Sequence, residues 1–428
     1  MTYQEALQYI HSVNWTKCRP SLGRIREMMD KMDNPDRSLR FIHIGGTNGK
    51  GSTSAMMAAV LQASGYTVGL YTSPFINHFG ERMQINGEMI SHEEVALITE
   101  YIKPIAESLS EIPSEFDIIT AMAMEFFKRH HCDIVVLEVG MGGEFDSTNF
   151  ISTPVLTILT AMGYDHTKEL GDTMTEIATA KSGIIKTNSD VVCYGQNPEA
   201  MAVFSRVCRE RHCSLTTADF SQLELGEFDL DGQYFSYKNH RDLRISLPGS
   251  YQPKNAAVVL EGLDILQKRG WHITEDAIRQ GFSHIHWPAR FEVLRRHPVF
   301  IVDGGHNPHG IQGTLESLQR LFPKKKITFL MGLMADKDWE HMISPLFPLA
   351  ARFFTAAPNN PRAISPQVLA DAIQRECSVP AIACDTVESA VDQAIAAAGT
   401  DGVICALGSL YMAGRIRTYL QSLPAENS

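Results

Sequence analysis

The chain has 428 residues, a formal net charge of −11, and a composition that is 44% hydrophobic and 20% charged. Its length exceeds what one hydrophobic core usually supports, so we expect two domains. The acidic balance argues against a nucleic-acid-binding surface, and the lack of any apolar run of about 18 residues argues against a membrane span.

The N-terminal residues and the cysteines both favour a cytoplasmic protein. The N-terminal sequence MTYQEALQYIHSVNW has no cationic region followed by an apolar core, which a secretory signal needs. The eight cysteines are scattered, and the closest pair, Cys208 and Cys213, has no second pair at zinc-site spacing. We therefore expect a cytoplasmic protein with reduced thiols.

Short β-branched runs followed by helical patterns recur along the first half of the chain. This alternation predicts strand–helix–strand units in a mainly parallel sheet with helices on both faces. From about residue 214 to 247 the pattern changes to short antiparallel strands, with a turn at Asp231-Gly232. The strands expected before that segment are residues 41–45, 67–72, 133–140, 154–161 and 190–195, with helices over 52–64, 93–109 and 116–130.

A second alternating series begins near residue 299. We therefore predict an α/β protein of two domains. Residues 1–290 form the first, a P-loop-containing, doubly wound, mainly parallel sheet with a small antiparallel subdomain. Residues 291–428 form the second, a Rossmann-like α/β domain. Its expected strands are residues 299–305, 326–332, 351–357, 381–385 and 402–408.

The strongest local signal is the glycine-rich segment Gly45–Ser52, GGTNGKGS, which lies between an expected strand and an expected helix. Glycines let the backbone turn its N–H groups onto a polyphosphate, the helix start adds partial positive charge, and Lys50 adds a full charge. The alternative is a plain glycine-rich turn. The segment departs from the common G-x-x-x-x-G-K-[ST] pattern, since Gly51 follows the lysine and Ile44 lies five residues before Gly49.

GTNGKGS resembles the loop of the Mur ligase superfamily and, within it, of folylpolyglutamate synthase and dihydrofolate synthase. Further segments resemble that family in the same order along nearly the whole chain. They are TSPF (72–75), ERMQING (81–87), LEVGMGG with DSTN (137–149), GYDHT (163–167), KSGIIK (181–186), Gln252 with Asn255, WPAR (287–290), DGGHNP (303–308), Asp336-Lys337-Asp338 and GSLY (408–411).

The resemblance implies an ATP-dependent, magnesium-requiring ligase that activates a carboxylate as an acyl phosphate and couples it to glutamate. It implies catalytic roles for Lys50, Lys181, His166 and His306, with carbamylation of Lys181 and a monovalent cation as further options. It places ATP at Thr47, Asn48, Gly49, Lys50, Gly51, Ser52, Asn255, Arg290 and Asp303. It places Mg²⁺ at Ser73, Glu138 and His166, and the substrates at Asp146, Arg82, His306 and Ser409.

Several of these residues also have ordinary structural explanations. An ionised Glu138 inside an apolar strand is costly unless it is paired or metal-bound. Taken alone, His166 fits a capping or core histidine, and Lys181 a solvated cation at a helix end. Ser409, at a strand–helix junction, fits a helix cap nearly as well as a ligand contact.

The expected acceptor is a reduced folate or dihydropteroate, handled by a monomer. In the family's pattern, Glu144 stands where Arg is usual, Phe75 where His is commoner, and Ala180 where Glu is usual. The alternatives are another Mur-type amino-acid ligase with a non-folate substrate, and a catalytically inactive nucleotide-binding protein with a regulatory role. ADP release against a panel of carboxylates separates the ligases, and the absence of any amine-dependent ATP turnover points to the inactive module.

Overall fold

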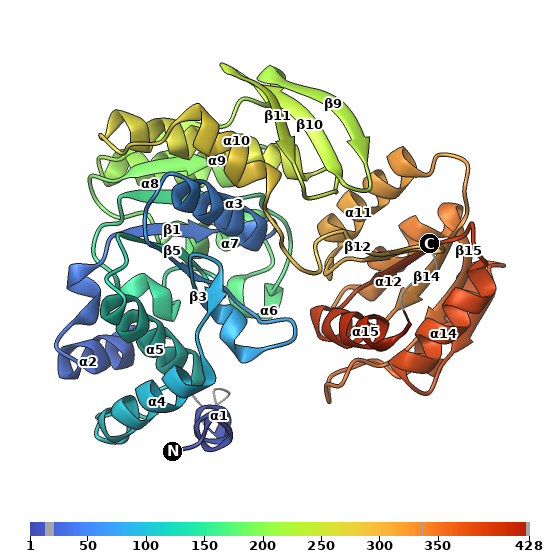
Figure 1. Ribbon diagram of the computed structural model, residues 1–428, viewed down its shortest axis with the longest axis horizontal. Coiled ribbons are helices and arrows are strands. Elements are labelled where there is room, and N and C mark those ends of the chain that lie inside the picture. Colours follow the sequence, from blue (N-terminus) through green and yellow to red (C-terminus); the bar gives the residue numbers. More distant parts are fainter. Residues whose placement is uncertain (13–20, 336, 425–428) are drawn as a thin grey trace. The chain divides into compact units, whose positions relative to one another are not determined.

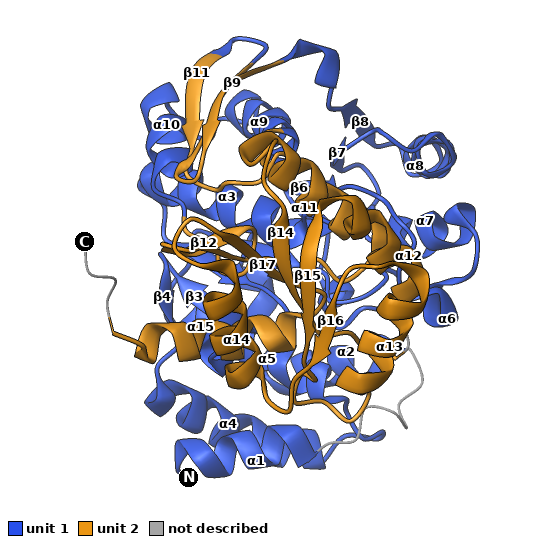
Figure 2. Ribbon diagram, turned by 90° about the vertical axis from the view of Figure 1, so that its right-hand side faces the viewer, with its two compact units in different colours: residues 1–223, 237–240, 254–285 blue, residues 224–236, 241–253, 286–428 orange. Residues whose placement is uncertain are grey.

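The computed structural model describes residues 1–12, 21–335 and 337–424, so Asp336 lies outside the described residues. The chain divides into two compact units, coloured separately in Figure 2. Unit 1 comprises residues 1–223, 237–240 and 254–285, and unit 2 comprises residues 224–236, 241–253 and 286–428. The predicted boundary at residue 290 stays a prediction.

Unit 1 is built on a mainly parallel sheet of eight strands in the order β4-β3-β2-β5-β1-β6-β7-β8. The pairs β2–β3 and β3–β4 are antiparallel, and the other pairs are parallel. The prediction of a doubly wound, mainly parallel sheet is therefore confirmed. The strands are β1 (Phe41–Gly45), β2 (Val68–Tyr71), β3 (Met83–Ile85), β4 (Glu88–Met89), β5 (Ile134–Glu138), β6 (Leu156–Leu159), β7 (Asp190–Cys193) and β8 (Ser214–Thr217).

Helices cover both faces of this sheet (Figure 1). On one face lie α3 (Lys50–Ala63), α9 (Gln252–Lys268) and α10 (Glu275–Ser283), and on the other lie α2 (Gly23–Lys31) and α5 (Glu115–Arg129). The remaining helices of this unit are α1 (Tyr3–Ser12), α4 (His92–Glu107), α6 (Thr167–Leu170), α7 (Met174–Ser182) and α8 (Pro198–Glu210).

Local sequence explains where several of these helices begin. In α5, the Ser114 side chain accepts a hydrogen bond from Asp117 N–H while Asp117 bonds back to Ser114. Thr173 and Glu176 form the same reciprocal pair at the start of α7. Each pair satisfies backbone N–H groups that have no partner inside the helix.

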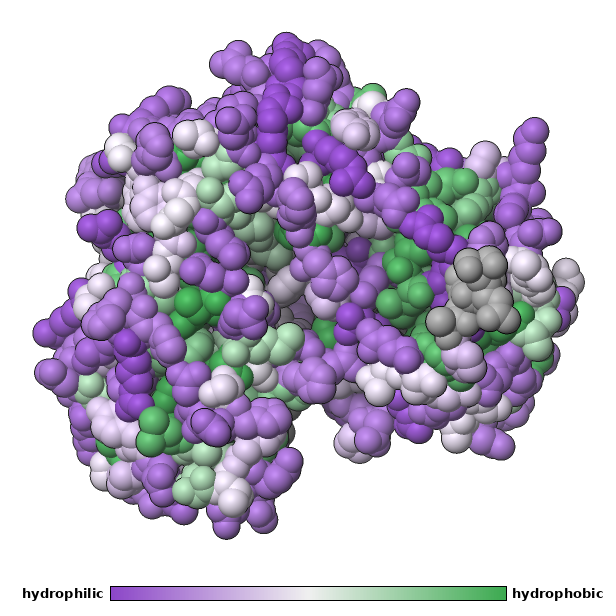
Figure 3. All heavy atoms as spheres, in the orientation of Figure 1, coloured by the Kyte–Doolittle hydropathy of each residue, from purple (hydrophilic) through white to green (hydrophobic). Residues whose placement is uncertain are grey.

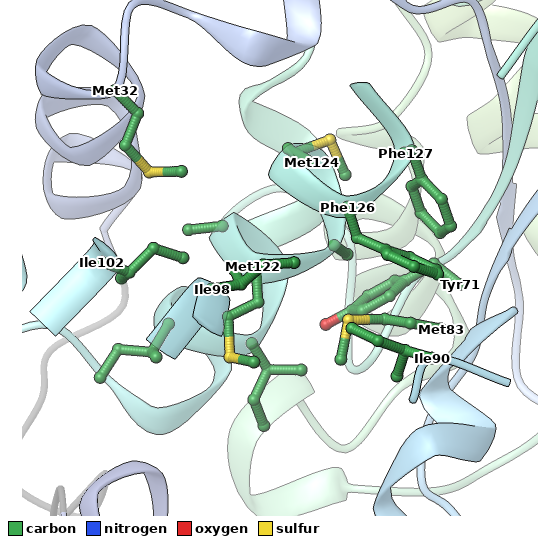
Figure 4. Packing of buried hydrophobic residues seen from close by; sticks show 14 of the residues in the cluster. Met32, Tyr71, Met83, Ile90, Ile98, Ile102, Met122, Met124, Phe126 and Phe127 are labelled. Atoms are coloured by element: carbon green, nitrogen blue, oxygen red, sulfur yellow. The ribbon is translucent and has the colours of Figure 1, made fainter. Parts of the chain in front are cut away.

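The core beneath α1, α2, α4 and α5 is rich in methionine and aromatic residues. Figure 4 shows Met122 and Phe126 of α5 packed with Tyr71 of β2 and Met83 of β3. A second cluster joins α7 and α8 to β7 and includes Ile184. Closely packed cores resist deformation, so these two clusters hold in place the loops that follow the strands between them.

The small three-stranded sheet has the order β11-β10-β9. Two-residue connections separate β9 (Leu223–Asp229) from β10 (Gly232–Tyr237) and β10 from β11 (His240–Ile245), as antiparallel hairpins require. The antiparallel segment is shorter than the predicted 214–247. Its expected first part, β8, instead pairs in parallel with β7 as the edge of the large sheet.

Unit 2 contains a six-stranded sheet in the order β12-β13-β17-β14-β15-β16, parallel except for the β12–β13 pair. This confirms the predicted second α/β sheet. Its strands are β12 (Glu292–Arg296), β13 (Val299–Val302), β14 (Ile327–Met331), β15 (Ala350–Thr355), β16 (Ala381–Ala383) and β17 (Val403–Leu407). Its helices are α11 (Pro308–Leu321), α12 (Trp339–Ile343), α13 (Pro366–Glu376), α14 (Val387–Ala398) and α15 (Leu410–Ser422).

On the face shown in Figure 3, hydrophilic side chains cover most of the surface and apolar residues form small separate areas. Among the described residues, no helix has both the length and the apolar character that a bilayer crossing requires.

Candidate active site

In unit 1, the parallel strands β1, β2, β5 and β6 end at one edge of the sheet. Loops that follow the carboxyl ends of such strands are the usual ligand sites of open α/β sheets. Here they contain the glycine-rich loop after β1, Ser73 after β2, Glu138 at the end of β5 and His166 after β6. The fold therefore brings residues from four distant parts of the sequence to one edge.

The glycine-rich loop leaves the start of α3 open. Gly49 precedes the helix with a φ of 85°, and no side chain caps the helix start. The first intrahelical bond runs from Thr53 N–H to Gly49 O, at 2.9 Å. The earlier N–H groups of the helix have no intrahelical acceptor, so this start offers donors and partial positive charge to an anion.

Backbone contacts hold this loop against the end of β6. The N–H groups of Thr47 and Asn48 both donate to Ala161 O, each at 3.0 Å. A Cβ atom at Gly46, which has a φ of 139°, would lie only 2.0 Å from Thr160 Oγ1. Only glycine fits this close approach, so the loop's shape is fixed by the neighbouring strand and leaves Lys50 available to a ligand.

Asn255, in the first turn of α9, lies against the same loop. A Cβ atom at Gly49 would be 2.7 Å from Asn255 Oδ1, and the asparagine is buried. Lys50 is half-buried, and its Nζ lies 3.3 Å from Thr47 O and 3.4 Å from Gly46 O. The structure thus places two predicted ATP-binding side chains at the loop.

Lys181 is buried against this loop rather than solvated at the end of α7. Its side chain is 5% exposed, and its Nζ donates to Gly46 O at 2.8 Å. Burial, reinforced by the positive charge of Lys50, lowers the pKa of Lys181 to about 7, although Asp165 and Asp146 act in the opposite direction. A large share of this amine is therefore neutral near pH 7, which is the form that reacts with carbon dioxide.

The candidate magnesium ligands fall into a contacting pair and a third residue. Glu138 is buried at the end of β5, and its Oε2 accepts a hydrogen bond from Ser73 N–H at 3.3 Å. His166 is exposed, has a φ of 51°, and lies 3.9 Å from Asp165 Oδ2 through its Nε2. A backbone hydrogen bond thus joins Ser73 to Glu138, while His166 lies in the loop after β6.

Within the described ranges, no group of three or more His, Cys, Asp or Glu residues could hold a metal ion. Protein-bound Mg²⁺ usually has one or two carboxylate ligands and is completed by water and substrate phosphates. A buried carboxylate beside an open helix start fits that kind of site. Glu138 therefore fits a metal that is shared with a nucleotide.

Asp146 organises the loop after β5. Its Oδ1 accepts from Thr148 N–H at 3.0 Å and from Thr148 Oγ1 at 2.5 Å, and its Oδ2 accepts from Met141 N–H at 2.9 Å. Burial raises the pKa of the Asp146 carboxyl, and these hydrogen bonds oppose that effect. Arg82, the other candidate substrate ligand in unit 1, stacks its guanidinium over the Phe75 ring at 5.2 Å.

Three candidate residues of unit 2 follow two adjacent strands, β13 and β17, whereas Arg290 precedes β12. Asp303 follows β13, and its Oδ2 accepts from Tyr251 O–H at 2.9 Å and Phe291 N–H at 2.8 Å, while its Oδ1 accepts from Gly305 N–H at 2.7 Å. This carboxylate holds three segments of its own chain together. Arg290 is half-buried and donates to the Ala289 carbonyl at 3.1 Å.

Ser409 precedes α15, but its side chain makes no capping hydrogen bond. Its Oγ is buried and has no hydrogen-bond partner in the part of the chain that the structure describes. The capping explanation for Ser409 is therefore wrong. Gly408 N–H donates to Gly305 O at 2.9 Å, which joins the two loops, and His306 Nδ1 lies 2.9 Å from Gly304 O.

Two family models match the chain: the Mur ligase middle domain over residues 44–261, and the Mur ligase glutamate ligase domain over residues 289–410. A dihydrofolate synthase/folylpolyglutamate synthase of Bacillus subtilis (strain 168) is 35% identical, over 98% of this chain and 99% of the relative. The chain belongs to the folylpolyglutamate synthase/dihydrofolate synthase family.

Solved structures of this family agree with the fold. Mycobacterium tuberculosis folylpolyglutamate synthase complexed with ADP and AMPPCP is 29% identical, with a TM-score of 0.89 and coverage of 99% of this chain and 100% of that chain. An FPGS–AMPPCP–folate complex is 34% identical, with a TM-score of 0.83 and coverage of 98% and 100%. The likeness therefore extends over both units of this family member.

Sequence reasoning missed several residues that shape the site of this family member. Ala161 and Thr160 hold the glycine-rich loop, the charge of Asp165 acts on Lys181, and the Tyr251 hydroxyl donates to Asp303. The first three lie in or beside segments that were already singled out. Tyr251 carried no signal, because a single tyrosine before a helix has many ordinary explanations.

Proposed function

We propose that this chain joins L-glutamate to the carboxylate of a reduced folate, and also to that of dihydropteroate, with conversion of ATP to ADP and phosphate. The observation that carries the proposal is an open helix start flanked by two lysines and a buried carboxylate, in a chain that matches a dihydrofolate synthase/folylpolyglutamate synthase over its whole length.

The chemistry requires activation of a carboxylate, because amide formation in water is unfavourable without a better leaving group. The γ-phosphoryl group of ATP is transferred to a carboxylate oxygen, which gives an acyl phosphate and ADP. The amine of glutamate then attacks the acyl carbon, the C–N bond forms, and inorganic phosphate leaves. Phosphoryl transfer depends mainly on positioning and on neutralising charge, so no protein nucleophile is needed.

In unit 1, the backbone N–H groups at the start of α3 and the Lys50 ammonium bind the phosphates and offset their charge. Glu138, Ser73 and His166 would hold Mg²⁺, which supplies further neutralisation of the phosphate oxygens. Asn255 supports the loop from α9. Asp146 and Arg82 contact the acceptor substrate.

Lys181 accepts carbon dioxide as a carbamate in this proposal. The support is its burial, its pKa of about 7, and the neighbouring positive charge of Lys50. Carbamylation converts the lysine amine to a negatively charged carbamate beside the metal site. The carbamate oxygens are of the kind that Mg²⁺ prefers as ligands.

In unit 2, Ser409 and His306 bind the incoming glutamate. The hydroxyl of Ser409 at the start of α15 is buried and has no hydrogen-bond partner within the described ranges, and it suits a carboxylate ligand because a helix start favours anions. Arg290 and Asp303 contribute to the nucleotide site, with Asp303 acting mainly by holding its own loop.

The test is to incubate the protein with ATP, Mg²⁺ and L-glutamate, offering dihydropteroate and tetrahydrofolate in separate reactions, and to weigh the products. We expect each acceptor to gain one or more glutamyl residues, with one ADP released per residue added. The same assay with Lys50→Ala controls for a contaminating ligase. ADP release without a heavier product from either acceptor would refute the proposal.

A further inference from the structure

Behind Asp146 lies a chain of buried polar groups that the proposed chemistry does not use. His43, in the middle of β1, is 0% exposed, and its Nε2 lies 2.9 Å from Thr148 Oγ1. Thr148 is equally buried, and its Oγ1 lies 2.5 Å from Asp146 Oδ1. Two hydrogen bonds thus link a central strand of the sheet to the carboxylate of Asp146, which is a candidate substrate-binding residue.

The direction of these hydrogen bonds follows from the donors available. An ionised carboxylate only accepts, so the single proton of the Thr148 hydroxyl goes to Asp146. Thr148 Oγ1 must then accept from His43, which fixes the proton of a neutral imidazole on Nε2. Burial, with the positive charge of Lys186, lowers the pKa of His43 to about 3, which keeps the ring neutral.

The remaining atoms of Asp146 are also held. Met141 N–H fixes Oδ2, and Thr148 N–H shares Oδ1 with the hydroxyl. The carboxylate is therefore held in one rotation, and because Oδ1 already accepts two of these hydrogen bonds, a lone pair remains for a ligand on Oδ2. A pterin presents N–H donors on its amino group and its ring, and a donor of this kind suits a carboxylate oxygen that is held in a fixed direction.

We propose that His43 is a positioning residue which, through Thr148, orients Asp146 so that its Oδ2 accepts a hydrogen bond from the pterin end of the acceptor substrate. This inference rests on the proposed function and deepens it. We call this chain of hydrogen bonds from His43 through Thr148 to Asp146 the relay. It also opposes protonation of Asp146, since each hydrogen bond donated to the carboxylate favours the ionised form over the neutral acid.

The neighbouring strand offers a matched control. Thr157 of β6 is the register partner of His43, and it is also 0% exposed. Its Oγ1 has no hydrogen-bond partner among the described residues, whereas Thr148 Oγ1 bonds on both sides. Replacing either threonine by valine removes one buried hydroxyl with little change in volume, but only one change breaks the relay.

The experiment compares Thr148→Val with Thr157→Val by titrating each protein with dihydropteroate in the absence of ATP, and by steady-state kinetics. We expect Thr148→Val to weaken dihydropteroate binding, and to raise its KM, by about tenfold, because a hydrogen bond to a charged group is lost. The KM for ATP should stay unchanged. Thr157→Val should bind dihydropteroate as the wild type does.

A second pair of variants tests His43 itself. His43→Leu removes the donor and should reproduce the loss seen in Thr148→Val, whereas His43→Gln keeps an N–H donor and should restore most of the affinity. A merely structural role would lower the melting temperature of both His43 variants without separating their dihydropteroate KM values, and that result would overturn the inference.

Two further outcomes keep this inference distinct from the proposed function. If the wild type forms no glutamylated product, the proposed function fails, and the relay fails with it. If the wild type ligates normally and Thr148→Val binds dihydropteroate as well as Thr157→Val does, the relay alone is refuted.

Discussion

The two sheet edges that contain the candidate residues are stabilised in opposite ways. In unit 1, backbone groups hold the glycine-rich loop, since Ala161 O accepts hydrogen bonds from two of its N–H groups. In unit 2, a carboxylate holds the loops, since both oxygens of Asp303 bond to the protein's own groups. Lys50 at the first edge therefore remains available for chemistry, whereas Asp303 at the second is largely used by the fold.

The largest effect that tests this comparison is expected for Lys50→Ala. Truncating this side chain removes no volume from the hydrophobic core, and the loop keeps its backbone contacts. We expect ligation to fall about 1000-fold, because a full charge facing the phosphates is lost. The melting temperature should stay within about 2 °C of the wild type. Normal turnover, or an unfolded variant, would break the comparison.

Asp303→Ala should have the opposite profile. It leaves the Tyr251 hydroxyl and two backbone N–H groups without their acceptor, and one of these N–H groups belongs to the buried Phe291. We expect a loss of about 3 kcal/mol in the free energy of unfolding, measured with denaturant. Asp385→Ala, at an exposed position of the same unit, is the control. An unchanged unfolding free energy for Asp303→Ala would contradict its structural role.

The buried Lys181 gives the first edge a pH-dependent stability. Its pKa of about 7 in the folded protein lies below its ordinary value near 10.4, so between these values the unfolded chain binds more protons. Stability from this group therefore rises with pH above 7. Compared with Lys181→Met in buffer free of carbon dioxide, the wild type should gain about 2 kcal/mol in unfolding free energy from pH 7 to pH 9.

A constant difference between the two proteins over that pH range would show that the amine is charged when folded. Repeating the measurement with added bicarbonate sharpens the result. If the amine is converted to a carbamate, the pH dependence of the difference should diminish, since the titrating group has been consumed.

The smallest effect is expected for Ser409→Ala. The hydroxyl has no hydrogen-bond partner among the described residues, so its removal should leave the melting temperature unchanged. If Ser409 binds glutamate, the KM for glutamate should rise about tenfold while the KM for ATP stays constant. Equal changes in both KM values, or a drop in melting temperature alone, would argue for a structural role.

Much of the fold was predictable because its signals are local. The strand over 41–45 matches β1, since an apolar run ends there at two glycines. The helix expected from residue 52 begins two residues earlier, because Gly49 adopts a left-handed conformation that propensity does not reveal. β8 was wrongly grouped with the antiparallel strands, because four residues carry no sign of which partner they pair with.

The site was predictable where motifs carry it and not where distant contacts do. Lys50 is placed by its own loop, whereas the burial of Lys181 depends on Gly46, which lies 135 residues away in the sequence. The relay from His43 to Asp146 spans about a hundred residues, and a histidine in an apolar strand gives no hint of its partner. Such contacts depend on tertiary packing, which periodicity does not encode.

The central claim is that the open start of α3 binds a nucleoside triphosphate beside the buried carboxylate of Glu138. A crystal structure with Mg²⁺ and a non-hydrolysable ATP analogue tests it most directly. We predict the triphosphate on the backbone N–H groups of residues 46–52, with Lys50 on its oxygens and the metal on Glu138. A nucleotide bound elsewhere, with that loop and Glu138 untouched, would contradict the account.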